Sequence, residues 1–256
     1  MSYRALLIDI DGTAVDAEAR NRSVVENLAL KGGIVINPAD WDTLAGKSHE
    51  DLWDILSGED PNYNIGDPQF RDQFPIAKEF SKACEDASTA RLDEICANPN
   101  VKLAVESHLL AGIVVGAVSN SNHHIVRLNL DHTGYQADAF KTIIGKDDVL
   151  QADLSPKPAP DPYYLALRNI NLYLHPNTDP IKPGECLVLE DSLTGVQSGL
   201  EFWADVIHLT DNSPHLSRQD EINLTGAFNT RYFPTGQDFL IETISNLPPN
   251  KGLVPA

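Results

Sequence analysis

Two carboxylates follow the first apolar run of this chain at a spacing that suits catalysis. Residues 5–10 are almost continuously apolar and carry Asp9, and Asp11, Gly12 and Thr13 come directly after them. A short apolar run broken by Asp-Gly is typical of a buried parallel strand that ends in a tight loop. Two carboxylates this close repel each other unless a cation lies between them or one of them holds a proton. Either arrangement can serve catalysis, because a metal-bound aspartate can attack phosphorus and a neighbouring aspartate can move a proton.

Three further motifs with chemically active residues occur later in the chain, each at the end of an apolar run. They are Ser119-Asn120, Lys157-Pro158 and Glu190-Asp191. In open α/β sheets, ligands bind just beyond the carboxyl ends of the parallel strands. A lone Asp-Gly motif also fits an ordinary turn after a strand. Four such motifs in order favour a shared site instead.

In their order and context the four motifs resemble those of the haloacid dehalogenase (HAD) superfamily of phosphotransferases. Residues 155–161 and 190–196 are most similar to the branch that contains β-phosphoglucomutase and phosphoglycolate phosphatase, and the resemblance covers roughly residues 3–210. It implies chemistry on phosphate esters, because the dehalogenase and phosphonatase branches do not carry an aspartate at the position of Asp11.

The resemblance implies roles for the acidic residues. Asp9 is the expected nucleophile, which attacks phosphorus and gives an aspartyl-phosphate that water later hydrolyses. Asp11 is the expected general acid/base, which protonates the leaving oxygen and then deprotonates the attacking water. We expect Mg²⁺ between the Asp9 carboxylate, the Asp11 backbone carbonyl and Asp191, since hard oxygen ligands suit this ion. Glu190 is expected to bind the metal directly or through water.

Three polar residues are expected to bind the phosphate group. Ser119 and Asn120 are placed to donate hydrogen bonds to phosphate oxygens at a helix N-terminus. Helix capping is the alternative role for both residues. Thr13 offers a hydroxyl and a backbone N–H to the same group.

Two lysines are candidates for charge neutralisation. Lys157 is expected to neutralise the phosphate and the Asp9 carboxylate as charge builds on the phosphoryl oxygens. A lone lysine is otherwise a solvated surface charge, and we expect the loss of Lys157 to affect catalysis far more than folding. Lys47 lies in a loop similar to one that reads the substrate in relatives, where it is expected to meet a second anionic group. An exposed loop lysine is the alternative for Lys47.

The elements that must position these residues alternate along the chain. Further strands are predicted by apolar runs at residues 113–118, 140–144, 186–189 and 206–209, the last strand that we expect. Helical periodicity separates them, which predicts right-handed crossovers and a Rossmann-like parallel sheet covered on both faces. The predicted fold class is therefore α/β. Apolar residues at 239–244 predict one short helix after the last strand.

Residues 15–97 interrupt this alternation. Their apolar residues recur at helical spacing, and the segment shows no convincing strand. We therefore expect an inserted helical cap domain at residues 15–97. The α/β core domain is expected to comprise residues 1–14 and 98–256.

The charge of the chain limits its partners. It has 19 basic and 37 acidic side chains, for a formal net charge of −18. This excess argues against nucleic acid or an anionic membrane as a partner, and no apolar run approaches the length of a membrane span. A phosphate ester would also be repelled unless Mg²⁺ and a few cations reversed the field at the site. Cys84, Cys96 and Cys186 form no C-x-x-C pair, which favours reduced thiols and a cytoplasmic location.

The expected function is a Mg²⁺-dependent phosphatase that acts on a small phosphorylated metabolite, such as a sugar phosphate. The alternative enzyme is a sugar phosphomutase of the β-phosphoglucomutase type. Those mutases carry a histidine where an ungapped alignment places Asn21, and His49 stands where they have a basic residue. Asn21 cannot titrate near pH 7, which favours the phosphatase. A catalytically silent binding protein is the third alternative, and the intact Asp9, Asp11 and Lys157 argue against it.

Overall fold

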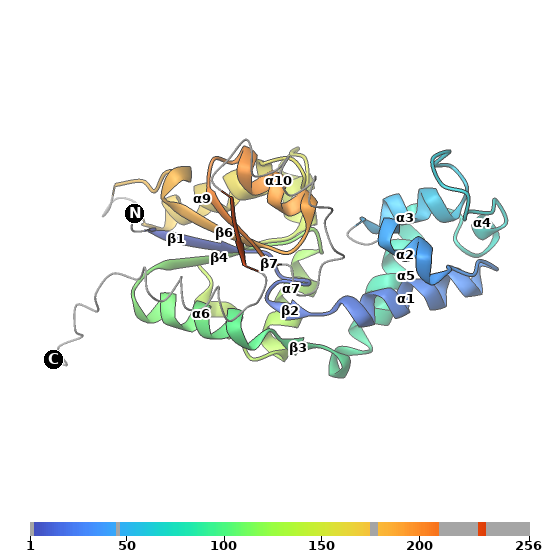
Figure 1. Cartoon of the computed structure of the whole chain (residues 1–256), viewed down its shortest axis with the longest axis horizontal. Coiled ribbons are helices and arrows are strands. Elements are labelled where there is room, and N and C mark those ends of the chain that lie inside the picture. The colour runs from blue at the N-terminus through green and yellow to red at the C-terminus, as the bar shows by residue number, and fades with distance from the viewer. Residues whose placement is uncertain (1–2, 45–46, 175–178, 210–229, 234–256) are drawn as a thin grey trace. The chain divides into compact units, whose positions relative to one another are not determined.

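The chain divides into two compact units. Unit 1 comprises Met1–Asp16 and Cys96–Ala256, and unit 2 comprises Ala17–Ile95. The computed structural model describes residues 3–44, 47–174, 179–209 and 230–233 (Figure 1). None of the helices in the described part of the chain combines the length and the apolar character that crossing a membrane requires.

Unit 1 is built on a six-stranded sheet with the strand order β5-β4-β1-β6-β7-β8. Its strands are β1 (Ala5–Ile8), β4 (Val114–Val118), β5 (Thr142–Ile144), β6 (Cys186–Glu190), β7 (Asp205–Leu209) and β8 (Thr230–Phe233). Every neighbouring pair is parallel, and Leu7 of β1 lies opposite Gly116 of β4 and Val188 of β6. This sheet confirms the predicted α/β class with a Rossmann-like core.

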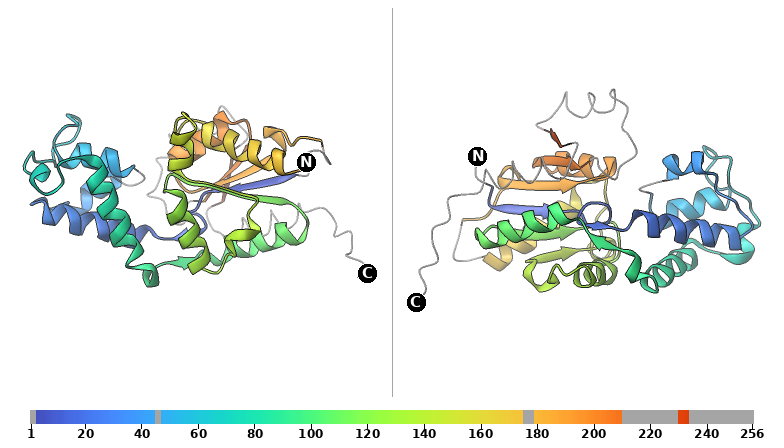
Figure 2. Two further views of the ribbon diagram at one scale, coloured as in Figure 1. Left: turned by 180° about the vertical axis from the view of Figure 1, so that it is seen from behind. Right: turned by 60° about the horizontal axis from the view of Figure 1, so that its bottom comes forward.

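Helices cover both faces of the sheet. One face carries α9 (Asp161–Leu174) and α10 (Leu193–Glu201), and the other carries α6 (Pro99–Leu110) and α7 (His123–His132) (Figure 1 and Figure 2). The short α8 (Lys146–Gln151) follows β5. Because successive side chains of a strand point to opposite faces, a strand covered on both sides needs apolar residues at every position. All four residues of β1 are fully buried, which accounts for its unbroken apolar run.

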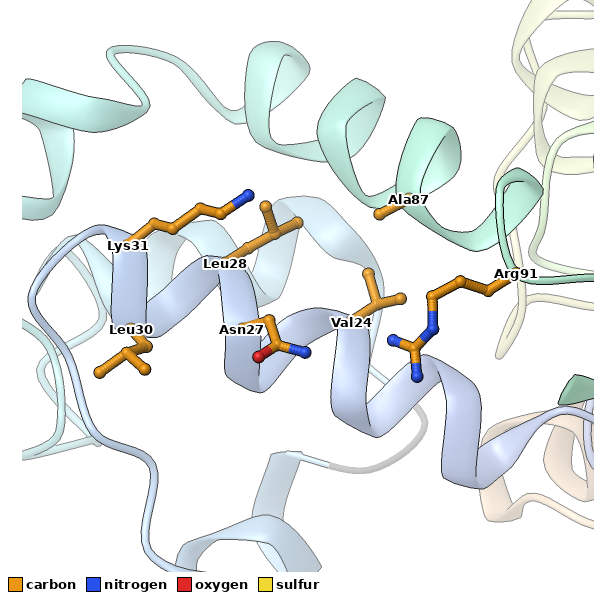
Figure 3. Close-up of a pocket in the computed structure, with 7 residues that line it drawn as sticks. All are labelled: Val24, Asn27, Leu28, Leu30, Lys31, Ala87 and Arg91. Atoms are coloured by element: carbon orange, nitrogen blue, oxygen red, sulfur yellow. The ribbon is translucent and has the colours of Figure 1, made fainter.

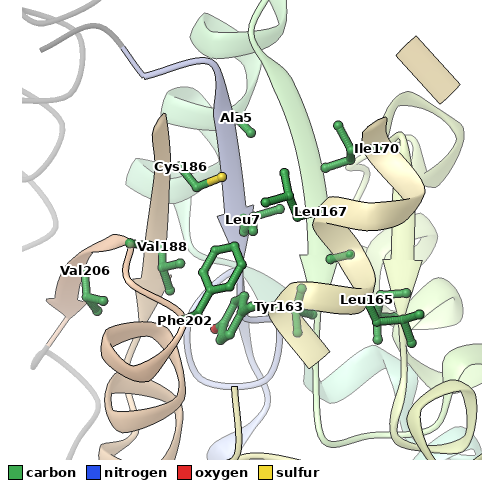
Figure 4. Packing of buried hydrophobic residues seen from close by; sticks show 14 of the residues in the cluster. Ala5, Leu7, Tyr163, Leu165, Leu167, Ile170, Cys186, Val188, Phe202 and Val206 are labelled. Carbon is green, nitrogen blue, oxygen red and sulfur yellow. The ribbon is translucent and has the colours of Figure 1, made fainter. Parts of the chain in front are cut away.

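The core under α9 and α10 joins the sheet to two aromatic rings. Leu7 and Val188 lie on this face of the sheet, near Tyr163 and Phe202 (Figure 4). The rings of Tyr163 and Phe202 are stacked, with their centroids 5.7 Å apart. Tyr163 is fully buried, so its hydroxyl requires a hydrogen-bond partner inside the protein.

Unit 2 is helical and has a core of its own. It contains α1 (Glu18–Lys31), α2 (Pro38–Leu44), α3 (His49–Leu56), α4 (Phe70–Gln73) and α5 (Ala77–Thr89). The rings of Phe70, Phe74 and Phe80 lie with centroids 5.2 to 5.5 Å apart. Ser48 caps α3 by accepting from the backbone N–H of Asp51, whose side chain returns the bond to the N–H of Ser48. Such a capping box satisfies two helix N–H groups at once.

The structure contains three short strands that the sequence did not reveal. β2 (Val15–Asp16) pairs with β3 (Cys96–Ala97) in an antiparallel ladder, although we expected residues 15–97 to hold no strand. Both segments therefore fall partly in unit 1, and the division of the chain lies two residues away from each expected boundary. Two residues are too few to show alternation. β8 also follows the strand that we expected to be last, and the helix expected at residues 239–244 lies outside the described residues.

Candidate active site

The carboxyl ends of β1, β4 and β6 bring predicted site residues to one edge of the sheet. Asp9 follows β1, and its backbone N–H donates to the Leu189 carbonyl of β6 at 2.9 Å. Ser119 follows β4, and Glu190 is the last residue of β6. The chain runs from β1 to β4 and β5 on one side and then crosses to β6 on the other. Ligand sites of open α/β sheets lie at such a reversal of strand order.

Lys157 lies inside the protein rather than on its surface. Its Nζ donates to Asp9 Oδ1 at 2.7 Å, to Glu190 Oε1 at 2.5 Å and to the Val118 carbonyl at 2.8 Å. Only 2% of its side chain is exposed. Burial lowers the pKa of Lys157, but the Asp9 and Glu190 carboxylates outweigh it and raise the pKa above the ordinary value. The expectation that this lysine matters little for folding is therefore wrong, because its removal would leave buried carboxylates without their cation.

Asp9 carries more negative charge around it than one ammonium group can balance. Its side chain is nearly buried. Burial first, and then the Glu190 carboxylate, raise its pKa from 3.8 to about 7, against the opposing effect of Lys157. This surplus of buried negative charge suits a site that receives an additional cation.

Glu190 is fully buried and held from three directions. Its Oε1 accepts from the Tyr163 hydroxyl at 2.7 Å as well as from Lys157, and its Oε2 accepts from the Ser192 hydroxyl at 3.2 Å. Burial, followed by the Glu190 carboxylate, raises the pKa of Tyr163 well above its ordinary value, so this phenol stays neutral and donates. Ser192 also caps α10 by accepting from the Gly195 N–H at 3.1 Å. The carboxylate is thus fixed in one orientation.

Asp191 is positioned by the turn after β1. The Thr13 hydroxyl donates to Asp191 Oδ1 at 3.0 Å. Gly12 has a φ of +92°, and a Cβ at this position would lie 2.0 Å from Asp191 Oδ2. Glycine is therefore required here both for the backbone conformation and for the close approach of the carboxylate.

Three carboxylates are grouped as metal ligands. Oxygen atoms of Asp9, Glu190 and Asp191 all lie within 4.8 Å of one another. A set made of oxygen donors alone suits a hard divalent cation such as Mg²⁺, and the raised pKa of Asp9 shows that positive charge is favourable there. These residues fit the expected ion. The Asp11 carboxylate is not part of this group, and metal binding by Asp11 through its backbone carbonyl stays a prediction.

Asp11 is instead bound by the segment that follows β4. Its Oδ2 accepts from Ser119 Oγ at 3.3 Å and from Ser121 Oγ at 2.7 Å. Its Oδ1 accepts from Asn129 Nδ2 at 3.0 Å. The two aspartates of the first motif therefore belong to different hydrogen-bond networks, one centred on Lys157 and one on α7.

The predicted phosphate ligands lie at the same edge of the sheet. Ser119 is buried, and its hydroxyl accepts from the Ser121 N–H at 3.0 Å while donating to Asp11. Asn120 Nδ2 is 3.4 Å from the Lys157 carbonyl. Its Oδ1 is buried without a hydrogen-bond partner among the residues that the structure describes. Phosphate binding by Ser119, Asn120 and Thr13 stays a prediction.

Lys47 belongs to unit 2 and not to the group formed in unit 1. Its Nζ lies 5.2 Å from the centroid of the Tyr63 ring, which is a cation–π contact. Its proposed contact with the substrate stays a prediction.

Unit 2 also carries a pocket, of about 530 Å³, between α1 and α5. Figure 3 shows Val24 and Leu28 of α1 along its length, with Ala87 of α5 on the other side. Lys31 and Arg91 supply its cationic groups, and Arg91 is engaged by Glu94. The lining holds no carboxylate and no nucleophile, so the chemistry outlined above belongs to unit 1.

Sequence reasoning missed three residues of the site. Tyr163 binds Glu190, Asn129 binds Asp11, and His208 Nε2 lies 2.9 Å from the Asp191 carbonyl. The signal for Asn129 is a polar residue at a buried position of an amphipathic helix. Tyr163 and His208 gave no such signal, because an aromatic residue in a helix and a histidine in a strand commonly belong to the core.

Several known proteins resemble this chain. A protein of Saccharomyces cerevisiae, named as a probable pseudouridine-5′-phosphatase, is 37% identical over 106 residues, which are 41% of this chain and 44% of that protein. The bifunctional riboflavin kinase/FMN phosphatase of Arabidopsis thaliana is 24% identical over 219 residues, which are 85% of this chain and 50% of that enzyme. The alignments thus span half of these two curated relatives or less.

Solved structures share the fold. The crystal structure of CbbY from Rhodobacter sphaeroides in complex with phosphate has a TM-score of 0.71 and 21% sequence identity, and the match covers 93% of this chain and 96% of that one. The sequence profile of the family described as haloacid dehalogenase-like hydrolase matches residues 3–202. This match spans most of the chain and includes every residue from Asp9 to Asp191, and the chain therefore belongs to the haloacid dehalogenase-like hydrolases.

Proposed function

We propose that this chain is a phosphatase that hydrolyses a small phosphorylated metabolite through an aspartyl-phosphate on Asp9. The observation that carries the proposal is the buried contact of Lys157 with Asp9 and Glu190, beside the carboxylate of Asp191. The phosphatases named among its relatives support the reaction class.

The first step is the attack of Asp9 on phosphorus. Lys157 holds Oδ1 of Asp9 at 2.7 Å, and we assign Oδ2 as the attacking oxygen. A bond forms from Asp9 to phosphorus while the bond to the leaving oxygen breaks. The buried ammonium group of Lys157 stabilises the charge that builds on the phosphoryl oxygens, an effect that is strong where water is excluded.

The proton transfers belong to Asp11. It gives a proton to the leaving oxygen in the first step and takes one from water in the second, so it returns to its starting state. Water attacks the aspartyl-phosphate, and inorganic phosphate leaves with Asp9 restored. Ser119, Asn120 and Thr13 are the proposed hydrogen-bond donors to the phosphate group.

Mg²⁺ is the proposed cofactor, held by Asp9, Asp191, the Asp11 backbone carbonyl and Glu190. When bound it supplies positive charge that balances the carboxylates and the phosphoryl oxygens. Both oxygens of Glu190 already accept hydrogen bonds from protein donors. This favours a contact of Glu190 with the ion through water.

The substrate class is a sugar phosphate or a similar small ester. A title among the structural neighbours names CbbY in complex with xylulose-(1,5)bisphosphate, which supports this class for the fold. The mutase alternative requires a group on unit 2 that takes part in proton transfer. Asn21 occupies that place, and its side-chain carbonyl accepts from the Arg20 guanidinium at 3.0 Å. A neutral amide held in this way favours hydrolysis over isomerisation.

The test is a panel of phosphate esters assayed for release of inorganic phosphate. Sugar phosphates, nucleoside 5′-monophosphates and phosphoglycolate are incubated with the protein and Mg²⁺, and then with EDTA. We expect release with Mg²⁺, loss of release with EDTA, and recovery when Mg²⁺ is restored. Asp9→Asn should lower turnover by several orders of magnitude, because the nucleophile is gone.

Each alternative has its own outcome in this test. An Asp9→Asn variant that keeps more than about a tenth of the turnover contradicts the covalent mechanism. Full activity in a metal-free preparation contradicts the cofactor. Conversion of β-glucose 1-phosphate to glucose 6-phosphate, with a trace of the 1,6-bisphosphate and little phosphate release, identifies a mutase. Binding of an ester without any turnover identifies a silent binding protein.

A further inference from the structure

A fully buried amide lies on the apolar side of α7. Asn129 is 0% exposed, and the other buried residues of the helix are Ile125, Val126 and Leu130. Asparagine is a weak helix former, and a buried amide is costly unless its polar atoms are hydrogen-bonded. An apolar residue would serve packing better at this position. The amide therefore calls for a reason beyond the core.

The Asn129 side chain reaches the expected general acid/base. Its Nδ2 donates to Asp11 Oδ1 at 3.0 Å, across 118 residues of sequence. Ser119 and Ser121 donate to the other oxygen, Oδ2. Asn129 is thus the donor that restrains Oδ1, and without it the carboxylate is held through one oxygen alone among the bonds described.

The arrangement leaves Asp11 room to act. A carboxylate has about four lone-pair sites, and three donors occupy three of them. One site remains for the proton that Asp11 exchanges with a leaving group or with water. Proton transfer depends on orientation, and a displacement of about 1 Å at a reacting group can cost about a hundredfold in rate.

We propose that Asn129 is a positioning residue for catalysis, which orients the Asp11 carboxylate by its hydrogen bond to Oδ1. The inference rests on the proposed function, because it assigns Asn129 a task only if Asp11 moves protons. Asn129 acts through Asp11 and makes no contact with the substrate. Its loss therefore lowers kcat and leaves KM and the ester preference unchanged.

The experiment is a double-mutant cycle on turnover. Asn129→Leu removes the donor at similar size, Asp11→Ala removes the general acid/base, and the third protein carries both changes. For Asn129→Leu we expect kcat to fall about tenfold to a hundredfold, with KM within about twofold of the wild type. In the Asp11→Ala background the same change should cost no further activity, because the group that it orients is gone. Asn129→Ala gives a second measurement if the leucine variant does not fold.

A matched control comes from another helix of unit 1. Asn171 of α9 donates to the Ile181 carbonyl at 2.9 Å and accepts from its N–H at 2.8 Å. Asn171→Leu should lower the melting temperature and leave kcat unchanged. If Asn129→Leu behaves like this control, or if it lowers activity equally with and without Asp11, the inference is wrong. A wild-type chain that hydrolyses no ester overturns the proposed function and the inference together, whereas an active wild type with additive losses overturns the inference alone.

Discussion

At the scale of single residues, burial changes the meaning of Lys157. In the sequence it is a lysine among prolines, and such a residue is normally a solvated charge. In the structure its Nζ contacts two carboxylates that are themselves buried. A buried ion pair adds little net stability over an apolar pair, but the loss of one partner leaves an uncompensated charge. The same side chain thus serves catalysis and folding.

Lys157→Ala is therefore expected to damage stability as well as turnover. Loss of the cation should lower the free energy of unfolding by about 3 to 5 kcal/mol, measured by urea denaturation, and abolish phosphate release. Lys82→Ala is the control, because Lys82 pairs with Asp86 at 2.7 Å on the surface and exposed pairs contribute little. A Lys157→Ala protein as stable as the Lys82→Ala protein would return Lys157 to the surface.

Asp9→Asn should stabilise the fold while it removes activity, in a pH-dependent way. The pKa of Asp9 is raised from 3.8 to about 7, so the ionised form is disfavoured in the folded protein. This cost is fully present above about pH 7 and disappears as the pH falls toward the ordinary value, where the carboxyl is protonated. In EDTA at pH 8 we expect Asp9→Asn to melt a few degrees above the wild type.

The pH series supplies its own control. The difference in melting temperature should shrink through the range between pH 7 and pH 4 and vanish at its acid end. A wild type that is more stable than Asp9→Asn at pH 8 in EDTA would show that the contact with Lys157 outweighs the cost of burial.

At the scale of elements, the first turn of α10 shows how a helix supports the acidic group. A Cβ at Gly195 would lie 1.9 Å from Glu190 Cδ. Glu190 cannot retreat, because it is fully buried and bound by Lys157, Tyr163 and Ser192. Intrinsic propensity favours alanine over glycine in a helix by about 1 kcal/mol, while overpacking costs about 1 to 3 kcal/mol. The packing cost is the larger of the two.

Gly195→Ala is expected to lower both the melting temperature and the activity, although it raises helix propensity. Displacement of Glu190 should also weaken Mg²⁺ binding, measured by calorimetry with the metal alone. Gly184→Ala is the control, since the nearest atom to a Cβ there is the Trp203 carbonyl oxygen at 4.0 Å. Equal stability of the two variants would mean that Glu190 has room to move.

At the scale of the whole molecule, the net charge of −18 acts on the approach of an anionic substrate. Long-range repulsion lowers the rate of encounter, and salt screens it. An increase in ionic strength from about 0.01 M to about 0.15 M shortens the Debye length from about 30 Å to about 8 Å. The long-range field should therefore weaken, while contacts within the site keep most of their strength.

We accordingly expect kcat/KM for a phosphate ester to rise over this range of salt at constant free Mg²⁺. The turnover number at saturating ester should stay unchanged, because screening acts on the encounter and not on the chemical steps. A fall in kcat/KM with salt would show that the field at the entrance is positive despite the net charge.

The local pattern of the sequence was sufficient for the fold class and for the identity of the acidic residues. Apolar runs that end in Asp9 and Glu190 reveal strands buried on both faces, because such strands need apolar residues at every position. Parallel strands present their carboxyl ends at one edge, so the order of the motifs along the chain was enough to place them together. These inferences depend on neighbours within a few residues.

Tertiary structure alone decided which side chains share a hydrogen bond. Asn129 and Asp11 are 118 residues apart, and Tyr163 and Glu190 are 27 apart, so no local periodicity connects either pair. The burial of Lys157 likewise depends on the packing of three separate segments around its Nζ. Sequence pattern reports the environment averaged over an element, whereas the charge state and orientation of a side chain depend on atoms within about 4 Å of it, whatever their place in the chain.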